Sequence, residues 1–338
     1  IAIYVNEYET RIAVLEDIML VELWVERPES EKIVGDIYKG KVKSIFPGMQ
    51  AAFIDIGTGK NAFLHVSDII EKETENYFEI EIVEEERVEF VKRKPQANIQ
   101  ELLKKEQDVI VEVVREPIGT KGARVTTQIT LAGRYLVLVP GQDYVAVSRK
   151  IADWSEKKRL KKIVWERKPK NSGVIVRTAA VGIKEKELKN DLKNLLKRWS
   201  KIDKQVRRKS APVLLYKEMS TIFGVIRDIF TTDIDRVLLD SKEEYKKIVK
   251  YVKSFAHQLA SKILFYQGNI PLFDTLNIES EIGKMLERKV YLKKGAYIII
   301  DQTEAMVTID VNTGGFVGRS SQEDTVLKTN LEAAKETA

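Results

Sequence analysis

The sequence predicts an α+β protein composed of several modules. Its 338 residues exceed the size at which a single hydrophobic core keeps growing, so we expect two to four modules. Short strands with glycine corners in the first half indicate a small β-barrel. Segments with helical spacing of apolar residues dominate the second half.

The composition excludes several classes of protein. The chain has no Cys, which rules out a disulfide scaffold, a thiolate-bound zinc ion and a cysteine nucleophile within these residues. Its longest apolar runs, such as 135–139, are far shorter than a bilayer span, and nothing resembles a secretory signal. We therefore expect a cytoplasmic protein without a membrane span.

The N-terminal elements are predicted from alternation. Residues 1–35 alternate apolar and polar side chains, which is typical of a small antiparallel sheet. Residues 36–57 contain two strands joined at Pro47-Gly48, and 61–66 supply a third. These short strands are expected to build an OB-like barrel.

The charge is distributed unevenly along the chain. Residues 36–120 carry 12 basic and 17 acidic side chains, and the acidic stretch 71–106 is expected to be an insertion into the barrel before its closing strand at 108–114. Residues 121–212 carry 25 basic and only 8 acidic side chains. Such a surplus is the electrostatic footprint of a nucleic-acid partner. The alternative is that these basic side chains have no partner and only keep a helix surface soluble, as a single run such as 157–162 would do.

The later elements follow from periodicity. Helices are predicted over 155–166 and 184–206, and the second has a buried stripe made by Leu188, Leu192, Leu195, Leu196 and Trp199. The remaining expected elements are strand-rich structure over 121–139, a strand over 171–182, strand or loop over 211–222 and 236–241, a helix over 243–264, strands over 296–301 and 305–312, and a helix from Asp324. This last helix has no C-terminal cap signal before residue 338, which predicts that the chain continues.

The barrel offers a candidate surface for single-stranded nucleic acid. Phe53 and Phe63 are expected to stack on unpaired bases, while Lys39, Lys41 and Lys43 follow the phosphate backbone. The alternative is that both phenylalanines belong to the core, as most strand phenylalanines do.

Arg177 and Thr178 end the predicted strand at the edge of the basic segment. A guanidinium with a neighbouring hydroxyl can hold a monophosphate through charge-assisted hydrogen bonds. Residues 121–124 and Arg149 are expected to converge on the same place. The Arg-Thr dipeptide is unspecific by itself, so an ordinary surface position is the alternative.

Asp310 and Asn312 form a candidate metal site. Because side chains alternate along a strand, Thr308, Asp310 and Asn312 share one face while Ile309 and Val311 are expected to be buried on the other. A carboxylate beside an amide oxygen suits Mg²⁺. One Asp is too few, and Asp301 is the nearest candidate for a second. The alternative is that Asp310 only caps the following glycine turn.

Several segments of the chain resemble the ribonuclease E/G family. Its catalytic signature is matched by DQTEAMVTIDVNTGGFVG (301–318) and KTNLEAA (328–334). Further matching segments are IYKGKV (37–42), PGMQAAFIDIG (47–57), KGARVTT (121–127), RTAA (177–180) and GNIPLF (268–273). The likeness runs in order from Ile1 to Ala338.

The resemblance implies a fold with four parts. A ribonuclease-H-like subdomain (1–35 and 213–280) is split by an OB-fold RNA-binding domain (36–120) and by a basic sensor of the RNA 5′ end (121–212). A deoxyribonuclease-I-like catalytic domain follows (281–338), and it is incomplete at residue 338.

The resemblance also implies roles for individual residues. Asp310 is a Mg²⁺ ligand and Asn312 positions the metal site. Phe53 and Phe63 are the base-stacking pair, and Arg115 is a basic RNA contact at the end of the barrel. Arg177 and Thr178 bind the 5′-monophosphate.

The implied function is Mg²⁺-dependent endonucleolytic cleavage of single-stranded RNA, in rRNA processing and mRNA turnover. The family's second metal-binding aspartate and its cysteine pair, which shares Zn²⁺ between the protomers of a homo-oligomer, lie beyond residue 338. The alternative for these residues alone is a non-catalytic module that recognises RNA 5′ ends.

Overall fold

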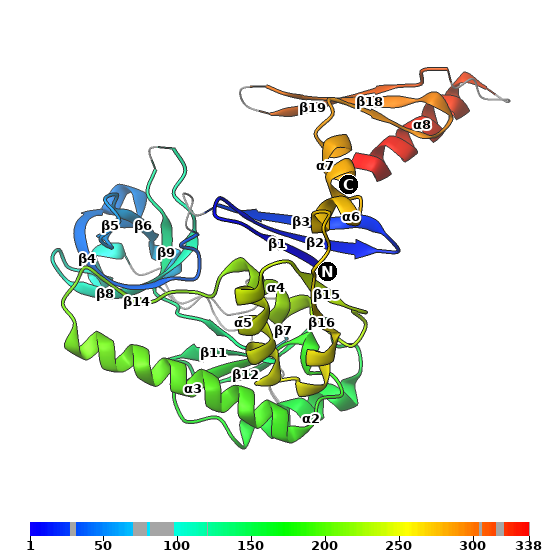
Figure 1. Ribbon diagram of the computed structural model, residues 1–338. Helices are drawn as coiled ribbons and strands as arrows, with labels where there is room; N and C mark the ends of the chain where they lie inside the picture. The colour runs from blue at the N-terminus through cyan, green and yellow to red at the C-terminus, as the bar shows by residue number, and fades with distance from the viewer. Residues whose placement is uncertain are drawn as a thin grey trace. The chain divides into compact units, whose positions relative to one another are not determined.

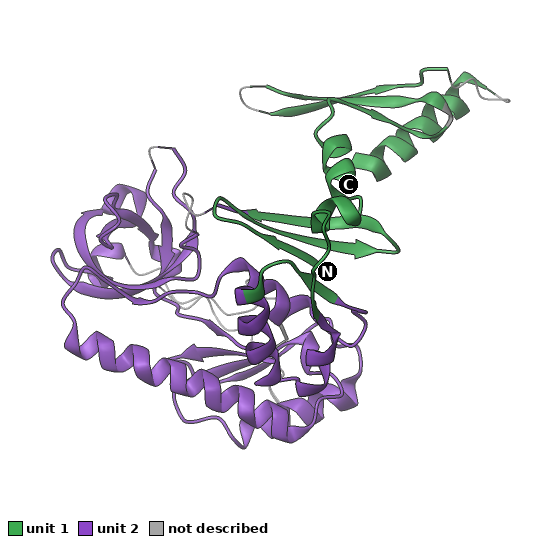
Figure 2. Ribbon diagram, in the orientation of Figure 1, with its two compact units in different colours: residues 1–25, 237–242, 264–338 green, residues 26–236, 243–263 purple. Residues whose placement is uncertain are grey.

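The structure, a computed structural model, describes residues 1–27, 32–69, 80–81, 98–119, 121–303, 306–315 and 321–337 (Figure 1). These residues form two compact units, which are described separately. Unit 1 comprises 1–25, 237–242 and 264–338, and unit 2 comprises 26–236 and 243–263 (Figure 2). The chain therefore crosses between the units more than once.

Unit 2 contains a closed barrel of five strands. These strands are β4 (Ile37–Phe46), β5 (Ala51–Asp55), β6 (Ala62–His65), β8 (Asp108–Arg115) and β9 (Arg124–Thr126). They are hydrogen-bonded in the order β4-β5-β6-β9-β8, and β8 pairs back with β4. The mixed α+β class and the predicted OB-like barrel are thus confirmed.

Strand β4 is shaped for this closure. Its first half pairs with β8 and its second half with β5, and a bulge between Val42 and Ser44 bends it between the two partners. A side chain at Gly40 would lie 2.5 Å from Ile54 Cγ2 and 3.0 Å from the Asp55 carbonyl. The absence of a Cβ therefore lets β4 and β5 approach closely.

Short elements connect the barrel strands. They are the 3-10 turns Pro47–Met49 and Val66–Asp68 and the single helical turn α1 (Ile99–Leu102). The proline turn joins β4 to β5, as predicted at Pro47-Gly48. Most of the acidic stretch 71–106 lies outside the described residues.

A second sheet of unit 2 has the strand order β10-β11-β13-β12-β7. Its strands are β10 (Leu131–Ala132), β11 (Leu136–Pro140), β13 (Ser172–Val176), β12 (Val145–Ser148) and β7 (Ile80–Glu81). Helix α2 (Trp154–Trp165) packs on β12 and β13, and helix α3 (Glu185–Arg208) packs on β10 and β11. Figure 1 shows both helices beside this sheet.

The apolar stripe of α3 holds this part together. Leu188, Leu192 and Leu195 are buried, and Leu196 and Trp199 pack at the margin of the same cluster. The predicted stripe is therefore confirmed. Each fully buried leucine contributes about 1.5–3 kcal/mol relative to an exposed one, so this helix is anchored mainly by its apolar face.

The rest of unit 2 differs from the expected boundaries. Strand β14 (Val213–Tyr216) pairs antiparallel with β4, so it lies with the barrel although the resemblance assigns 213–280 to the ribonuclease-H-like part. The reason is that the edge of β4 at 37–39 leaves backbone groups to be paired. Helix α4 (Thr221–Ile229) follows, and its early residues were expected to be strand or loop.

The predicted helix over 243–264 is shorter than expected. Helix α5 (Lys242–Lys253) ends eleven residues early and is followed by a 3-10 segment, His257–Lys262, and β16 (Ile263–Phe265). Ala256 leaves the helical conformation with φ −142° and ψ 70°. The apolar spacing continues past this point because Leu259 is buried in the 3-10 segment and Ile263 is buried at the start of β16.

Unit 1 has a sheet of order β16-β15-β1-β2-β3. Strands β1 (Ala2–Val5), β2 (Thr10–Glu16) and β3 (Met19–Glu26) form the predicted antiparallel arrangement, and β15 (Val237–Leu239) runs parallel to β1. Two short helices, α6 (Leu272–Thr275) and α7 (Ile278–Met285), were not predicted. They contribute Leu272, Phe273 and Ile278 to a core that contains Ala2 and Ala13.

The last part of unit 1 carries the metal-site candidates. Strands β17 (Lys289–Tyr291), β18 (Tyr297–Gln302) and β19 (Val307–Asn312) form an antiparallel sheet, and helix α8 (Gln322–Thr337) packs against β19. The two predicted strands and the helix agree with these bounds to within two residues. Every helix in the described ranges is too short or too polar to cross a bilayer.

Glu112 gives the barrel a pH-sensitive contact. Its buried carboxylate accepts hydrogen bonds from the Thr130 backbone N–H at 2.5 Å and from the Thr130 hydroxyl at 2.9 Å. Burial raises the pKa of Glu112 from 4.5 to about 7. Between these two values the folded state keeps a proton that the unfolded chain has released, so stability falls as pH rises through this window.

Replacing Glu112 by Gln should therefore stabilise the protein by about 3 kcal/mol at pH 8 and by less than about 1 kcal/mol at pH 5. Thermal unfolding of the parent and of Glu112→Gln at the two pH values measures the difference. A stabilisation of equal size at both pH values would contradict the assignment of this titration to Glu112.

Candidate functional site

A row of side chains crosses the outer face of the barrel. In the strand register, Phe53 lies opposite Ser44, Phe63 opposite Phe53, Arg124 opposite Phe63, and Arg115 opposite Arg124. Directly opposed residues point to the same face of a sheet. The register therefore places two aromatic rings next to two guanidinium groups.

The aromatic part of this row is larger than predicted. The Phe53 and Phe63 rings lie 5.9 Å apart edge to face, and both are half-buried on the outside of the barrel. Phe46 lies 5.5 Å from Phe53, and the His65 ring stacks at 6.5 Å from Phe63. The two predicted phenylalanines thus belong to a continuous aromatic surface rather than to the barrel core.

The two arginines of the row have different environments. The guanidinium of Arg124 binds the buried Asp68 through Nε at 3.0 Å and Nη2 at 2.9 Å. Arg115 is exposed at the end of β8. Arg115 is therefore the more accessible cation for a phosphate, and Arg124 is a fixed one.

The three lysines of β4 are paired with carboxylates. Lys39 and Lys41 both lie near Asp108, at 3.1 and 3.7 Å, and Lys43 lies 3.7 Å from Asp55. Lys39 also donates to the carbonyls of Val206 and Lys209 at the end of α3. Lys39 therefore anchors α3 to the barrel, and the contact of these lysines with RNA stays a prediction.

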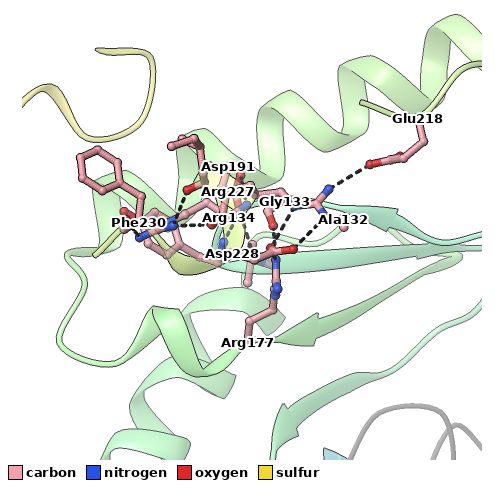
Figure 3. Close-up of polar contacts among 12 residues, drawn as sticks. Ala132, Gly133, Arg134, Arg177, Asp191, Glu218, Arg227, Asp228 and Phe230 are labelled. Carbon is pink, nitrogen blue, oxygen red and sulfur yellow. Dashed lines mark hydrogen bonds and ion pairs between the residues drawn. The ribbon is translucent and has the colours of Figure 1, made fainter. Parts of the chain in front are cut away.

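Arg177 is held at the end of β13 by two acceptors. Its Nη1 donates to the Gly133 carbonyl at 2.8 Å and to Asp228 Oδ1 at 2.6 Å (Figure 3). These two bonds occupy both hydrogens of Nη1. The contacts of Arg177 with described side chains run through Nη1, so Nε and Nη2 are left to receive an anion. Thr178 is exposed beside it in a 3-10 turn.

Asp228 lies between two arginines. Arg227 donates to it through Nε at 3.0 Å and Nη2 at 3.1 Å, and Arg227 in turn binds Glu218 at 3.0 Å, as Figure 3 shows. Burial opposes ionisation of Asp228, but Arg227 and Arg177 outweigh it and lower the pKa of the Asp228 carboxyl. Asp228 is therefore ionised and fixed near neutral pH.

The same network fixes helix α4. Buried Arg134 donates to the carbonyls of Ile226, Arg227 and Phe230 at the C-terminal end of α4. Asp191 of α3 accepts from the backbone N–H groups at the start of β11. Arg134 thus caps the helix that carries Asp228, and the position of Arg177 depends on three elements far apart in sequence.

Sequence reasoning did not find these partners of Arg177. Residues 121–124 and Arg149 were expected to converge on it, whereas Arg124 lies in the barrel row bound to Asp68. The Arg227-Asp228 dipeptide gave no local signal, because its charges look like an ordinary polar helix face. Phe46 was not among the predicted aromatic residues of this surface.

Asp310 and Asn312 lie side by side on β19, as predicted. Asn312 Nδ2 donates to Asp310 Oδ2 at 2.9 Å, and Asp310 is exposed. This bond orients the amide, and it uses neither Asp310 Oδ1 nor the side-chain oxygen Asn312 Oδ1, which are the candidate ligands. Two hard oxygen donors of this kind suit Mg²⁺. Ile309 and Val311 were expected to be buried, but each is 37% exposed, because α8 covers only part of this small sheet.

Asp301 is engaged elsewhere. Its two carboxylate oxygens accept from Arg288 Nε and Nη2 at 2.5 and 2.8 Å. Across the ranges that the structure describes, no group of three or more His, Cys, Asp or Glu side chains could hold a metal ion. Asp310 and Asn312 are thus part of a ligand set at most. Residues 304–305 and 316–320 of the signature lie outside the described residues.

Comparison with known proteins gives a consistent result. Residues 130–338 match the model of the ribonuclease E/G family. Over 98% of its length the chain is 44% identical to ribonuclease G of Escherichia coli strain K12, and 41% identical to ribonuclease G of Haemophilus influenzae. It is also 37% identical to ribonuclease E of Haemophilus influenzae, of which it covers 34%.

The chain spans about two thirds of the ribonuclease G relatives, 66% of the Escherichia coli protein and 65% of the Haemophilus influenzae protein. The matched family region includes β19 with Asp310 and Asn312, and it also includes Arg177 and Asp228. By sequence identity, coverage and the family match, this chain belongs to the ribonuclease E/G family.

Proposed function

We propose that the protein is an endoribonuclease that cleaves single-stranded RNA and favours RNA with a 5′-monophosphate. The observation that carries the proposal is the exposed Asp310–Asn312 pair on β19, in a chain of the ribonuclease E/G family. The names of its relatives, ribonuclease G and ribonuclease E, support a role in RNA processing. We extend the proposal to rRNA processing and mRNA turnover, which the resemblance implies.

The barrel row supplies RNA binding in this proposal. Bases of an unpaired strand would stack on Phe53 and Phe63, and Arg115 would contact a phosphate at the end of the row. Paired bases cannot offer their faces to these rings, so the surface favours single strands.

Asp310 and Asn312 supply the reactive site. Mg²⁺ bound there would neutralise charge on the scissile phosphate and lower the pKa of a water molecule. The carboxylate of Asp310 provides the negative charge that retains the cation, and Asn312 orients this carboxylate. Attack of water on the phosphorus would break the bond between phosphorus and the 3′ oxygen, and this oxygen would take up a proton. The products would be a 5′-phosphate and a 3′-hydroxyl.

The second candidate is a module that binds RNA 5′ ends without cleaving them. It is favoured by the incomplete ligand set among the described residues. Incubation of the chain with a labelled 5′-monophosphate oligonucleotide and Mg²⁺ separates the two functions. Binding without shortening supports the module, and Mg²⁺-dependent shortening supports the nuclease.

Arg177→Ala should abolish the preference for 5′-monophosphate RNA over 5′-hydroxyl RNA. A charge-assisted contact contributes about 1.5–3 kcal/mol, so the ratio of the two affinities should fall by at least about tenfold. Dissociation constants for two oligonucleotides that differ only at the 5′ end measure the ratio. Equal weakening on both RNAs would contradict the sensor role.

The contact with Asp228 gives a companion variant. Asp228→Ala removes the acceptor that orients Arg177 but keeps the arginine, so the preference should fall while affinity for 5′-hydroxyl RNA is retained. Asp233→Ala, in the loop after α4, is the matched control. An unchanged preference in Asp228→Ala would show that Arg177 does not need this partner.

Assembly into homo-oligomers and a Zn²⁺ ion shared between protomers stay predictions. The cysteine ligands that the resemblance implies are absent from these 338 residues.

A further inference from the structure

Helix α2 presents two tryptophans to solvent. Trp154 is 68% exposed and Trp165 is 55% exposed, which is unusual for the largest apolar side chain. They are eleven positions apart, close to three helical turns, so they lie on the same side of the helix. The buried Leu160 and Val164, which pack into the core, lie about 80–120° around the helix from this side.

Lysines occupy the surface between the two rings. Lys158 and Lys161 lie on the line from Trp154 to Trp165, and Lys162 lies beside it. We call Trp154, Lys158, Lys161, Lys162 and Trp165 the α2 stripe. Among the described residues, no carboxylate pairs with these three lysines. This contrasts with the lysines of β4, each of which has a carboxylate partner.

The acid of α2 does not neutralise the stripe. Glu156 is the one carboxylate within the helix, and it is bound by Arg159 at 2.6 and 2.7 Å and by the Gly182 N–H at 2.8 Å. The hydrogen bonds from Arg159 lower the pKa of Glu156 to about 2. The negative charge of Glu156 is thus paired with Arg159. The α2 stripe therefore keeps the net positive charge of its three lysines.

Both rings are held in place from within the chain. Lys158 Nζ lies 5.3 Å from the centre of the Trp154 ring, and Lys168 Nζ lies 4.7 Å from that of Trp165. Lys168 is itself buried and paired with Asp143, so it supports Trp165 from one face. A ring that is fixed on one side and open on the other is a preorganised surface for stacking.

We propose that the α2 stripe is a second binding surface for single-stranded RNA, separate from the barrel row. Aromatic faces interleaved with cations whose charge no carboxylate neutralises are the combination that binds unpaired nucleotides without sequence preference. Residues 121–212, in which the stripe lies, carry the basic surplus of the chain. The tryptophans are about 16 Å apart along the helix, the span of about five stacked nucleotides. This inference rests on RNA as the ligand of the proposed function.

The test is RNA binding by the chain with the stripe altered. The probe is an unstructured 5′-hydroxyl 20-nucleotide RNA in excess chelator, so that neither cleavage nor 5′-end recognition contributes. Trp154→Ala with Trp165→Ala should weaken binding about tenfold or more. Tyr8→Ala, which removes an aromatic ring that is 77% exposed in unit 1, is the matched control. Because both tryptophans are exposed, the double variant should keep the parent's thermal unfolding.

The lysines give an independent readout. Lys158→Glu with Lys162→Glu should reduce the slope of log affinity against log salt concentration by about two or more. Lys246→Glu with Lys250→Glu on α5 makes the same charge change at the same spacing and should have a smaller effect. Equal effects of the two pairs would attribute the loss to net charge and overturn the proposal.

The possible outcomes distinguish failure of the α2-stripe proposal from failure of the proposed function. If the parent does not bind this RNA, the proposed function fails. If Phe53→Ala with Phe63→Ala weakens binding but the tryptophan variant does not, the proposed function survives and the stripe is refuted. If the tryptophan variant changes only self-association in sedimentation, the stripe binds protein, and the proposal is likewise overturned.

Discussion

Asp310→Asn in the full-length protein should reduce RNA cleavage by about a thousandfold or more while RNA affinity changes little. The substitution keeps the size of the side chain but removes the negative charge that retains the metal ion. Metal-ion stabilisation of a phosphoryl transition state amounts to several kcal/mol, and each 1.4 kcal/mol is about a tenfold change in rate. Single-turnover cleavage of a labelled oligonucleotide, with binding measured in parallel, tests this.

Two comparisons make this experiment specific. Asp301→Asn should lose much less activity, because the Asp301 carboxylate is already bound by Arg288. Asn312→Asp keeps an oxygen ligand but places a second carboxylate against Asp310 at hydrogen-bond distance, so it should shift the Mg²⁺ dependence. Parent-level cleavage by Asp310→Asn would remove the basis of the proposed mechanism.

Phe53→Ala with Phe63→Ala should weaken the binding of single-stranded RNA by about a hundredfold. Each base stacked on an aromatic side chain contributes about 1–3 kcal/mol, and the two rings lie in one row. The slope of log affinity against log salt should stay unchanged, since no charge is removed. Fluorescence anisotropy with an unstructured oligonucleotide at several salt concentrations measures both quantities.

The half-buried position of these rings requires a control for folding. Phe53→Leu with Phe63→Leu keeps most of the apolar contact with the barrel but offers no flat ring, so it should bind RNA almost as weakly as the alanine variant. Arg115→Ala should instead lower the salt slope by about one. Parent-level RNA binding by the leucine variant would mean that the rings serve only to pack the barrel.

Much of the fold follows from local patterns in the sequence. The α3 stripe is predicted because leucines at helical spacing can be buried together only on one face. The barrel strands are predicted because short alternating segments end at Pro47-Gly48 and at other turn residues. Periodicity failed in the second half of 243–264, because Leu259 and Ile263 keep apolar spacing in a segment that is not α-helical.

The resemblance to the family predicted a role for residues that the sequence patterns alone left undecided. The alternation along β19 already predicts that Asp310 and Asn312 share a face, and the structure places them in hydrogen-bond contact. Only the family signature singles this pair out as a metal site. The sequence pattern by itself left a turn-capping Asp as an equal alternative.

By itself the sequence determined which side chains occur at alternating or helical positions, and hence the barrel strands, the core of α3 and the common face of Asp310 and Asn312. The tertiary structure alone decided which distant groups meet: Asp228 with Arg177, Asp108 with Lys39 and Lys41 of β4, and Arg124 with Phe63. The physical reason is that periodicity is set by the local geometry of the backbone, whereas the partner of a charge depends on strand order and helix packing. Those are fixed only when the whole chain buries its apolar surface.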